Sequence, residues 1–174
     1  AYEQGQALYA AQCDNILCSS ATTSIIESTG VGDLHASIII GTDGLPLIGY
    51  RNSKDATLKI AHCQTMSCET STTNTLANSG NVGLHTSIAI GTDGLGVLSY
   101  YNAATGDLEV AHCNNTACSS AEINSVDTEF DFGQYSAIAI GNDGLPLISY
   151  YDSTNNDLKV AHCSNIICSS TDSV

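Results

Sequence analysis

The sequence predicts an all-β protein built from tandem 50-residue repeats, each a four-stranded antiparallel unit like the blade of a β-propeller. Three observations lead to this prediction. Cysteine pairs with four residues between them recur every 50 residues. Short aliphatic and β-branched segments are separated by Gly- and Asp-containing turns, and helical periodicity is absent. Four strands in about 50 residues, repeated in tandem, match the size and content of a propeller blade.

The first strand of each repeat is aliphatic and is expected at 37–40, 87–90 and 137–140. A Gly-Thr/Asn-Asp-Gly turn leads into the second strand, and Asp-Gly between two apolar segments is a strong hairpin signal. The second strands are expected at 45–50, 95–100 and 145–150, and the third end at the first cysteine of each pair. The fourth strands are the least regular, near 23–26, 73–76 and 123–126. Residues expected near the core are Ile38, Ile40, Leu47, Ile48, Ile88, Ile90, Ile138, Ile140 and Ile148.

The chain contains about 3.5 such repeats in one domain, 1–174. The expected divisions are a partial repeat at 1–35, repeats at 36–85 and 86–135, and a partial repeat at 136–174. The first piece is expected to supply strands three and four, and the last already contains strands one to three and the start of four. The two ends therefore duplicate each other, which disfavours a closed monomeric propeller. An unpaired sheet edge invites pairing with another chain, so a homo-oligomer, an open head-to-tail fibre and part of a longer protein are all left open.

The charge balance restricts the partners. Four Lys and Arg face 18 Asp and Glu, for a net charge of −14. Nucleic acid and anionic membrane surfaces are bound through clusters of cationic side chains, and this chain has only four such residues. No apolar run approaches the roughly 18 residues needed to span a bilayer, so membrane insertion is not expected either.

The segment DGLPLISYYDSTNNDLKVAHCSNIIC at 143–168, with weaker copies over nearly the whole chain, resembles a family of bacterial secreted proteins. Members contain tandem propeller-like repeats with the text DGLP-x-ISYYD, then DLKVAHC, then a second cysteine. The resemblance implies a propeller-type protein that is extracellular or on the cell surface. It brings no defined activity with it.

The even number of cysteines in four identical pairs indicates intra-repeat disulfides formed in an oxidising compartment. The expected disulfides are Cys13–Cys18, Cys63–Cys68, Cys113–Cys118 and Cys163–Cys168. The alternative is a metal site in which a neighbouring histidine, such as His62, joins the cysteines. Adjacent residues in a strand point to opposite faces, and structural zinc sites favour closer cysteine spacing. We therefore expect no metal and no cofactor.

Histidine and aspartate recur at fixed repeat positions. His62, His112 and His162 are expected to be buried and to form hydrogen bonds between blades. His35, His85 and Tyr135 precede strand one and are interpreted as structural polar residues. Asp43, Asp93 and Asp143 lie in the first turn, where Asp tolerates a left-handed backbone and bonds its own turn. A ring of these carboxylates holding Ca²⁺ is the functional alternative.

Tyrosines close the second strand of each repeat. The candidate ligand-binding residues are Tyr50, Tyr100, Tyr101, Tyr150, Tyr151 and Asp152. Such rings are expected to pack at the blade rim. Their alternative role is to stack on and hydrogen-bond a sugar.

Catalysis is not expected, because every candidate carboxylate is copied in each repeat, whereas acid–base chemistry needs two groups in different environments. The sequence therefore favours a non-enzymatic, self-assembling structural protein, such as a surface or filament component, whose partner is another copy of itself. The alternative is a lectin-like module that binds glycans through several equivalent weak sites.

Overall fold

The computed structural model describes residues 1–4, 7–28, 35–128 and 131–172, which form antiparallel sheets that we number as blades 1 to 4. Blade 1 contains β1 (Tyr2–Gln4), β2 (Ala7–Cys13) and β3 (Ala21–Ser28). Blade 2 contains β4 (Ser37–Ile40), β5 (Pro46–Asn52), β6 (Thr57–Cys63) and β7 (Ser71–Ala77). Blade 3 contains β8 (Leu84–Ile90), β9 (Gly96–Asn102), β10 (Asp107–Cys113) and β11 (Ala121–Asp127). Blade 4 contains β12 (Phe132–Ile140), β13 (Pro146–Asp152), β14 (Asp157–Cys163) and β15 (Thr171–Asp172).

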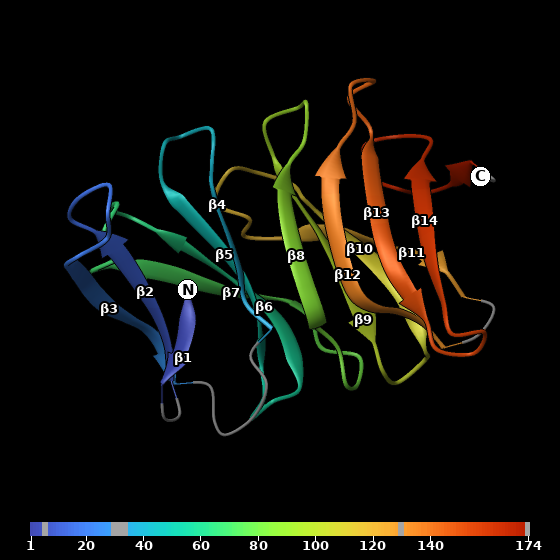
Figure 1. Cartoon of the computed structure of the whole chain (residues 1–174), viewed down its shortest axis with the longest axis horizontal. Coiled ribbons are helices and arrows are strands. Elements are labelled where there is room, and N and C mark those ends of the chain that lie inside the picture. Colours follow the sequence, from blue (N-terminus) through green and yellow to red (C-terminus); the bar gives the residue numbers. More distant parts are fainter. Residues whose placement is uncertain (5–6, 29–34, 129–130, 173–174) are drawn as a thin grey trace.

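The blades stand in a row and do not close into a ring (Figure 1). Blade 1 lies at one end of the row and blade 4 at the other, as do the two chain termini. The predicted all-β architecture of repeated four-stranded antiparallel units is confirmed. The described residues contain no helix able to cross a membrane.

The first blade has one strand more than the sequence predicts. β1 pairs with β2 so that Tyr2 lies opposite Tyr9, the position that Tyr50 takes opposite Lys59 in blade 2. β1 is therefore the end of a second strand, and blade 1 does not begin at strand three. Two residues separate β1 from β2, whereas four separate β5 from β6. This shorter connection moves the register by two residues, which hides the match from a repeat aligned at a fixed period.

Each blade uses its two faces for two different neighbours. Side chains alternate along a strand, so Leu58 and Ile60 of β6 face blade 3, whereas Ala61 and Cys63 face blade 1. We call the first the forward face and the second the backward face. This alternation follows from the two-residue period of a strand, and it makes each pair of adjacent blades share one apolar core.

Three cores of this kind hold the row together. Blades 1 and 2 share a core around Leu8 and Tyr50, and blades 2 and 3 share one around Leu58 and Leu98. Blades 3 and 4 share a third around Leu108 and the fully buried Ile148. Since one blade cannot cover its own two faces, stability comes from stacking on a neighbour.

The aliphatic first strands are less buried than the sequence predicts at one place. Ile88 is 6% exposed, but Ile38 and Ile40 are 44% and 48% exposed. Ile38 lies opposite Ile48, whose face looks toward blade 1. Among the described residues, blade 1 has no first strand to pack against β4, which leaves these two side chains half-exposed, and the prediction that they lie near the core is wrong.

Candidate functional site

The four predicted disulfides are present, one in each blade, with Cα–Cα distances of 4.8 to 4.9 Å. Each closes the tight connection between the third and fourth strands. In blade 1 the side chain of Asn15 shapes that connection, because its Oδ1 accepts hydrogen bonds from the backbone N–H groups of Leu17 and Ser19. The disulfides of blades 2, 3 and 4 are buried, whereas Cys13 and Cys18 are exposed. Every blade therefore has the same disulfide, but this disulfide is exposed in blade 1 and buried in the other three blades.

The three repeated histidines bond within their own blade. Nε2 of His62 lies 2.7 Å from Oδ2 of Asp43, and the pairs His112–Asp93 and His162–Asp143 lie at 2.8 and 2.7 Å. The prediction that these histidines join neighbouring blades is wrong. His62 lies opposite Leu47 at the start of β5, so the turn just before that strand is the nearest source of an acceptor. The constant separation of 19 residues in all three repeats is a sequence signal that could have shown this pairing, but our prediction did not use it.

The turn aspartates also use their second oxygen within the blade. Oδ1 of Asp43 accepts a hydrogen bond from the backbone N–H of Leu45 at 3.0 Å, and Asp93 and Asp143 repeat this contact. Burial acts against ionisation of Asp43, but these hydrogen bonds outweigh it and lower its pKa. The residues that the structure describes contain no group of three or more His, Cys, Asp or Glu that could hold a metal ion. The turn backbone holds one oxygen of each carboxylate, and the histidine of the third strand holds the other.

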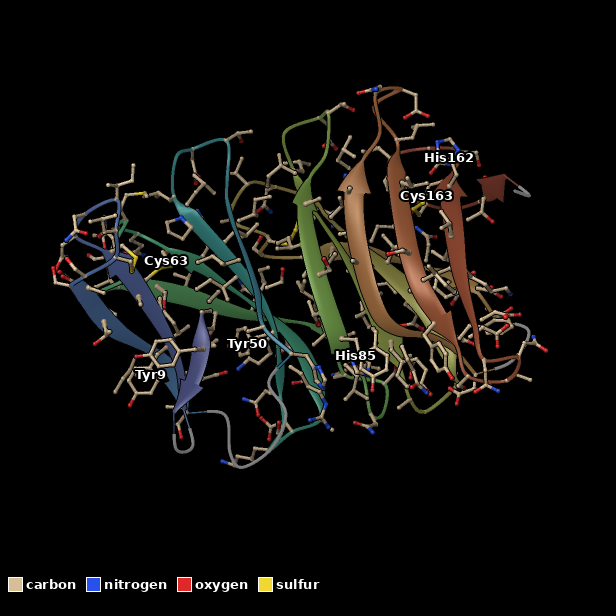
Figure 2. The ribbon with its side chains drawn as sticks, in the orientation of Figure 1. Tyr9, Tyr50, Cys63, His85, His162 and Cys163 are labelled. Atoms are coloured by element: carbon tan, nitrogen blue, oxygen red, sulfur yellow. A yellow bond between two sulfur atoms is a disulfide. The ribbon has the colours of Figure 1, made fainter. Side chains whose placement is uncertain are left out.

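The candidate tyrosines divide into buried and surface rings. Tyr50, Tyr100 and Tyr150 are 0%, 0% and 4% exposed and lie inside the interblade cores. Figure 2 shows Tyr50 between the strands of the first two blades. Such rings offer no face to a sugar, so their surroundings agree with packing between blades. Tyr101 is 9% exposed, and Tyr151 is the partly exposed ring of the set.

A carboxylate lies beside each of the three buried tyrosines, Tyr50, Tyr100 and Tyr150. Tyr50 donates a hydrogen bond to Oε2 of Glu27 in blade 1, at 2.6 Å. The same carboxylate accepts a hydrogen bond from Asn52 and forms an ion pair with Lys59. Burial together with Glu27 raises the pKa of the Tyr50 hydroxyl far above its usual value. The cluster is therefore a neutral hydroxyl and an ion pair that link two blades.

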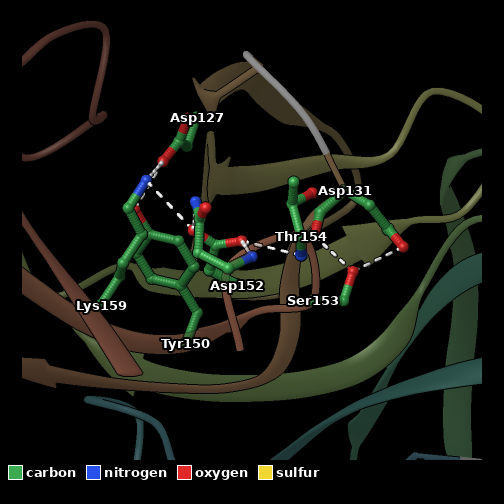
Figure 3. A network of polar contacts seen from close by, with 8 residues as sticks. Asp127, Asp131, Tyr150, Asp152, Ser153, Thr154 and Lys159 are labelled. Carbon is green, nitrogen blue, oxygen red and sulfur yellow. Dashed lines mark hydrogen bonds and ion pairs between the residues drawn. The ribbon is translucent and has the colours of Figure 1, made fainter. Parts of the chain in front are cut away.

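A similar cluster joins blades 3 and 4 (Figure 3). Tyr150 donates to Asp127 at 2.6 Å, and Lys159 lies 3.3 Å from Asp127 and 3.9 Å from Asp152. Lys159 also lies 3.7 Å from the centre of the Phe132 ring, a cation–π contact. Asp152, a candidate ligand residue, is 1% exposed and accepts hydrogen bonds from its own turn. Its role in the structure is to close that turn and balance Lys159.

The forward face of blade 4 is the most distinctive surface of the chain. Leu8, Leu58 and Leu108 occupy one repeat position and are 0% exposed, because a blade follows each of them. The equivalent Leu158 is 78% exposed, and Val160 and Leu147 are 45% and 40% exposed. We call the surface formed by Ala137, Ala139, Leu147, Ser149, Leu158 and Val160 the end face. Sequence reasoning missed it because Leu158 is identical in type to its three buried counterparts.

The end face contains a hollow of about 210 Å³, lined by Ala137, Ala139, Leu147, Ser149 and Val160 together with Ile138. The preceding interfaces show what fills such a hollow. In blade 2 the equivalent of Ser149 is Gly49, and a Cβ added there would lie 2.5 Å from the side chain of Leu98 in blade 3. An aliphatic side chain of the following blade therefore lies against this position between blades 2 and 3, whereas the Cβ of Ser149 occupies that space in blade 4.

Comparisons with known proteins add little to this geometry. No family model matches the sequence, and no curated protein matches it. Among solved structures, a fucose lectin from Kordia zhangzhouensis in complex with methyl-fucoside has a TM-score of 0.49 and 12% sequence identity. The match covers 73% of this chain and 90% of the lectin. Similarity at this level supports no statement about what this chain binds.

Proposed function

We propose that this protein is an extracellular structural repeat protein that assembles by docking the end face of one copy onto blade 1 of another. The observation that carries the proposal is the exposure of Leu158, 78%, against 0% for Leu8, Leu58 and Leu108. Burying one leucine side chain stabilises by about 1.5–3 kcal/mol, and the neighbouring Val160 and Leu147 add to this.

The receiving surface is the backward face of blade 1. Ala61, Cys63 and Cys68 cover Leu8 and Ala10 in the core between blades 1 and 2. Their counterparts in blade 1 are Ala11, Cys13 and Cys18, and all three are exposed. Docking them on Leu158 and Val160 repeats the part of the interblade interface that the third strand and the disulfide form, since the described residues of blade 1 include no first strand.

The disulfide connections support the same arrangement. A Cβ added at Gly91 in blade 3 would lie 2.9 Å from Ile166, so the disulfide connection of blade 4 packs on the turn of the preceding blade. The counterpart of Ile166 in blade 1 is Ile16, which is 101% exposed. We expect Ile16 of one copy to cover Gly141 of another. A forward face that meets a backward face is a head-to-tail contact, which builds open filaments unless the rotation closes a ring.

The environment and chemistry of the chain agree with this proposal. Four disulfides suit an oxidising compartment, which favours an extracellular or cell-surface location. The His–Asp pairs recur unchanged in three blades, which suits a repeated structural contact better than a single catalytic centre. Glycan binding through the strand-two tyrosines has less support, because three of the five rings are 4% exposed or less.

The test is the mass of the particle in solution. Light scattering after size exclusion should give a mass that rises with concentration for the wild-type chain. Leu158→Glu should remain monomeric, because the charge would be buried at the docked face. Thr105→Glu adds the same charge in an exposed turn of blade 3 and serves as the matched control, which should assemble like the wild type. A wild-type monomer at all concentrations, or full assembly of Leu158→Glu, would refute the proposal.

A further inference from the structure

Three aromatic residues form a row across blades 2, 3 and 4 at the start of each first strand. The rings of His35 and His85 lie 4.4 Å apart between centroids, and those of His85 and Tyr135 lie 4.3 Å apart. Figure 2 shows His85 at the end of its strand that is remote from the disulfides. We call His35, His85 and Tyr135 the ring row.

The backbone at all three positions is left-handed. The φ angles of His35, His85 and Tyr135 are 41°, 55° and 54°. The pairing of β8 and β12 with the following strands also shifts register at these residues, as in a β-bulge. A left-handed conformation costs a residue with a side chain about 1–2 kcal/mol, and bulges re-aim side chains. All three blades therefore keep an unfavourable left-handed backbone at this position, and the rings there point away from the strand edge.

Tyr135 ends the row with one side open. It is 70% exposed, and the ring of Tyr151 stands at an angle of 61° to it, with centroids 6.4 Å apart. Two tyrosine rings at a corner provide an apolar floor and wall on the surface. Tyr151 is also cross-strand neighbour to Gln134, so an amide lies at the edge of this corner.

Polar groups surround the two rings. The carboxylate of Asp131 accepts hydrogen bonds from Tyr101, from Ser153 at 2.7 Å and from Gln134 at 3.4 Å. Figure 3 shows Ser153 directed at Asp131. The hydrogen bonds from Tyr101, Ser153 and Gln134 lower the pKa of Asp131, so it is ionised at neutral pH. On the other side, Tyr151 donates to Oδ1 of Asn156 at 2.7 Å.

We propose that this corner binds a neutral sugar, whose apolar face stacks on Tyr135 and whose hydroxyls bond to Asp131, Gln134 and Asn156. A sugar hydroxyl both donates and accepts. The two amides carry N–H donors and carbonyl acceptors, and the carboxylate adds acceptors only, which matches such a ligand. An organic cation would also stack on tyrosine and be attracted by the ionised Asp131, so a cation is included in the test as the competing ligand.

This inference does not require the assembly proposed above. The described strands of blade 1 include no first strand, so a docked copy supplies none of the described rings to continue the row over Tyr135. Tyr151 of the corner, however, lies opposite Leu158 across β13 and β14, so the corner adjoins the end face. Sugar binding is therefore measured in monomeric protein, where no docked copy can cover Tyr151.

The experiment titrates the full chain with the methyl glycosides of glucose, galactose and mannose, using saturation-transfer NMR and calorimetry. It is run in the wild type, diluted until it is monomeric, and in Val160→Glu, which places a charge on the end face opposite Ser149 and not opposite Tyr151. At least one glycoside should bind in both, and Tyr135→Ala should weaken binding at least tenfold. Tyr2→Ala removes another exposed tyrosine, 40% exposed in blade 1, and should bind like the wild type.

A second variant guards against a folding artefact. Gln134→Ala keeps both rings and should weaken binding about tenfold, as expected for one hydrogen-bonding group worth about 1.4 kcal/mol. Binding of tetramethylammonium in place of all three glycosides would refute the proposal. So would the absence of saturation transfer from any of them, or wild-type affinity in Tyr135→Ala.

Discussion

The hydroxyl of Tyr50 in blade 2 lies 2.6 Å from the carboxylate of Glu27 in blade 1, and this contact ties two blades by a charge-assisted hydrogen bond. Tyr150 and Asp127 repeat it between blades 3 and 4 at the same distance. The interface between blades 2 and 3 is different, because Ala77 stands where the other two have Glu27 and Asp127. There Glu109 stands where blades 2 and 4 have Lys59 and Lys159, and it accepts a hydrogen bond from Asn102 at 3.0 Å.

Removing the Tyr50 hydroxyl should destabilise the fold. Tyr50→Phe leaves the Glu27 carboxylate without one of its donors, and loss of a hydrogen bond to a charged group costs about 1.5–3 kcal/mol. Urea unfolding of the Leu158→Glu monomer, with and without the change, measures this loss. Tyr2→Phe is the control, since that ring is on the surface. An equal effect of both changes would show that the buried contact contributes nothing.

The interface between blades 2 and 3 should tolerate a Glu–Lys pair like that of Glu27 and Lys59 only when Ala77 and Glu109 are both changed. Glu109→Lys places an ammonium group in a position 9% exposed with Ala77 opposite, so the single variant should lose several kcal/mol. Ala77→Glu adds a second carboxylate near Glu109 and should also destabilise. The double variant recreates the pair of Glu27 and Lys59. A double-mutant cycle should therefore show a favourable coupling of about 1–3 kcal/mol, whereas strict additivity would contradict the equivalence of the three interfaces.

Stability should fall at acid pH, in part through Glu27. Burial acts to raise the pKa of Glu27, but the hydrogen bonds from Lys59, Tyr50 and Asn52 outweigh it and lower that pKa. In the unfolded chain the pKa is about 4.3, so the unfolded state binds the proton more readily. The contribution of Glu27 is then complete above about pH 5 and is lost progressively as the pH falls from the unfolded value through the lowered pKa of the folded state.

Lys59→Met should flatten this pH dependence, because it removes one of the groups that hold the carboxylate ionised. Unfolding free energies at several pH values between 7 and 3 measure the effect. Lys54→Met changes an exposed lysine in the same blade and serves as the control. Parallel pH profiles for both variants would exclude Glu27 as a source of acid sensitivity.

The disulfides should be reduced in a definite order. Thiol–disulfide exchange requires access to a sulfur atom, and Cys13 and Cys18 are exposed whereas the other three pairs are at most 1% exposed. Brief treatment with a mild reductant followed by alkylation and peptide mass analysis should label Cys13 and Cys18 first. In assembled protein the same pair should be protected, since it lies at the proposed docked face. Equal labelling in the Leu158→Glu monomer and the wild-type assembly would count against that face.

Salt should favour assembly. Each copy carries a net charge of −14, so association brings like charges together, and the repulsion is screened beyond about 8 Å at physiological ionic strength. Added salt weakens this repulsion but does not weaken the burial of apolar side chains. The mass of the particle at fixed protein concentration should therefore rise between low salt and about 0.5 M sodium chloride. Scattering measurements that show dissociation with added salt would indicate an ionic contact in place of the end face.

Local signals in the sequence were sufficient for the strands, turns and disulfides. The Asp-Gly hairpins, alternating side chains and 50-residue cysteine spacing depend on contacts within a single repeat. For this reason β5, β6 and the pair Cys63–Cys68 lie within a residue or two of their predicted positions. The faces of Leu58, Ile60, Ala61 and Cys63 follow from the same two-residue period.

Tertiary structure decided which copies of an identical residue are covered. Leu58 and Leu158 have the same type and the same local sequence role, yet their exposure is 0% and 78%, because burial depends on the neighbouring blade and not on the strand itself. The same reason separates buried Tyr101 from partly exposed Tyr151, and buried Cys63 from exposed Cys13. A repeated sequence contains the interface once per repeat, but the position of each repeat in the row determines where that interface remains open to a partner.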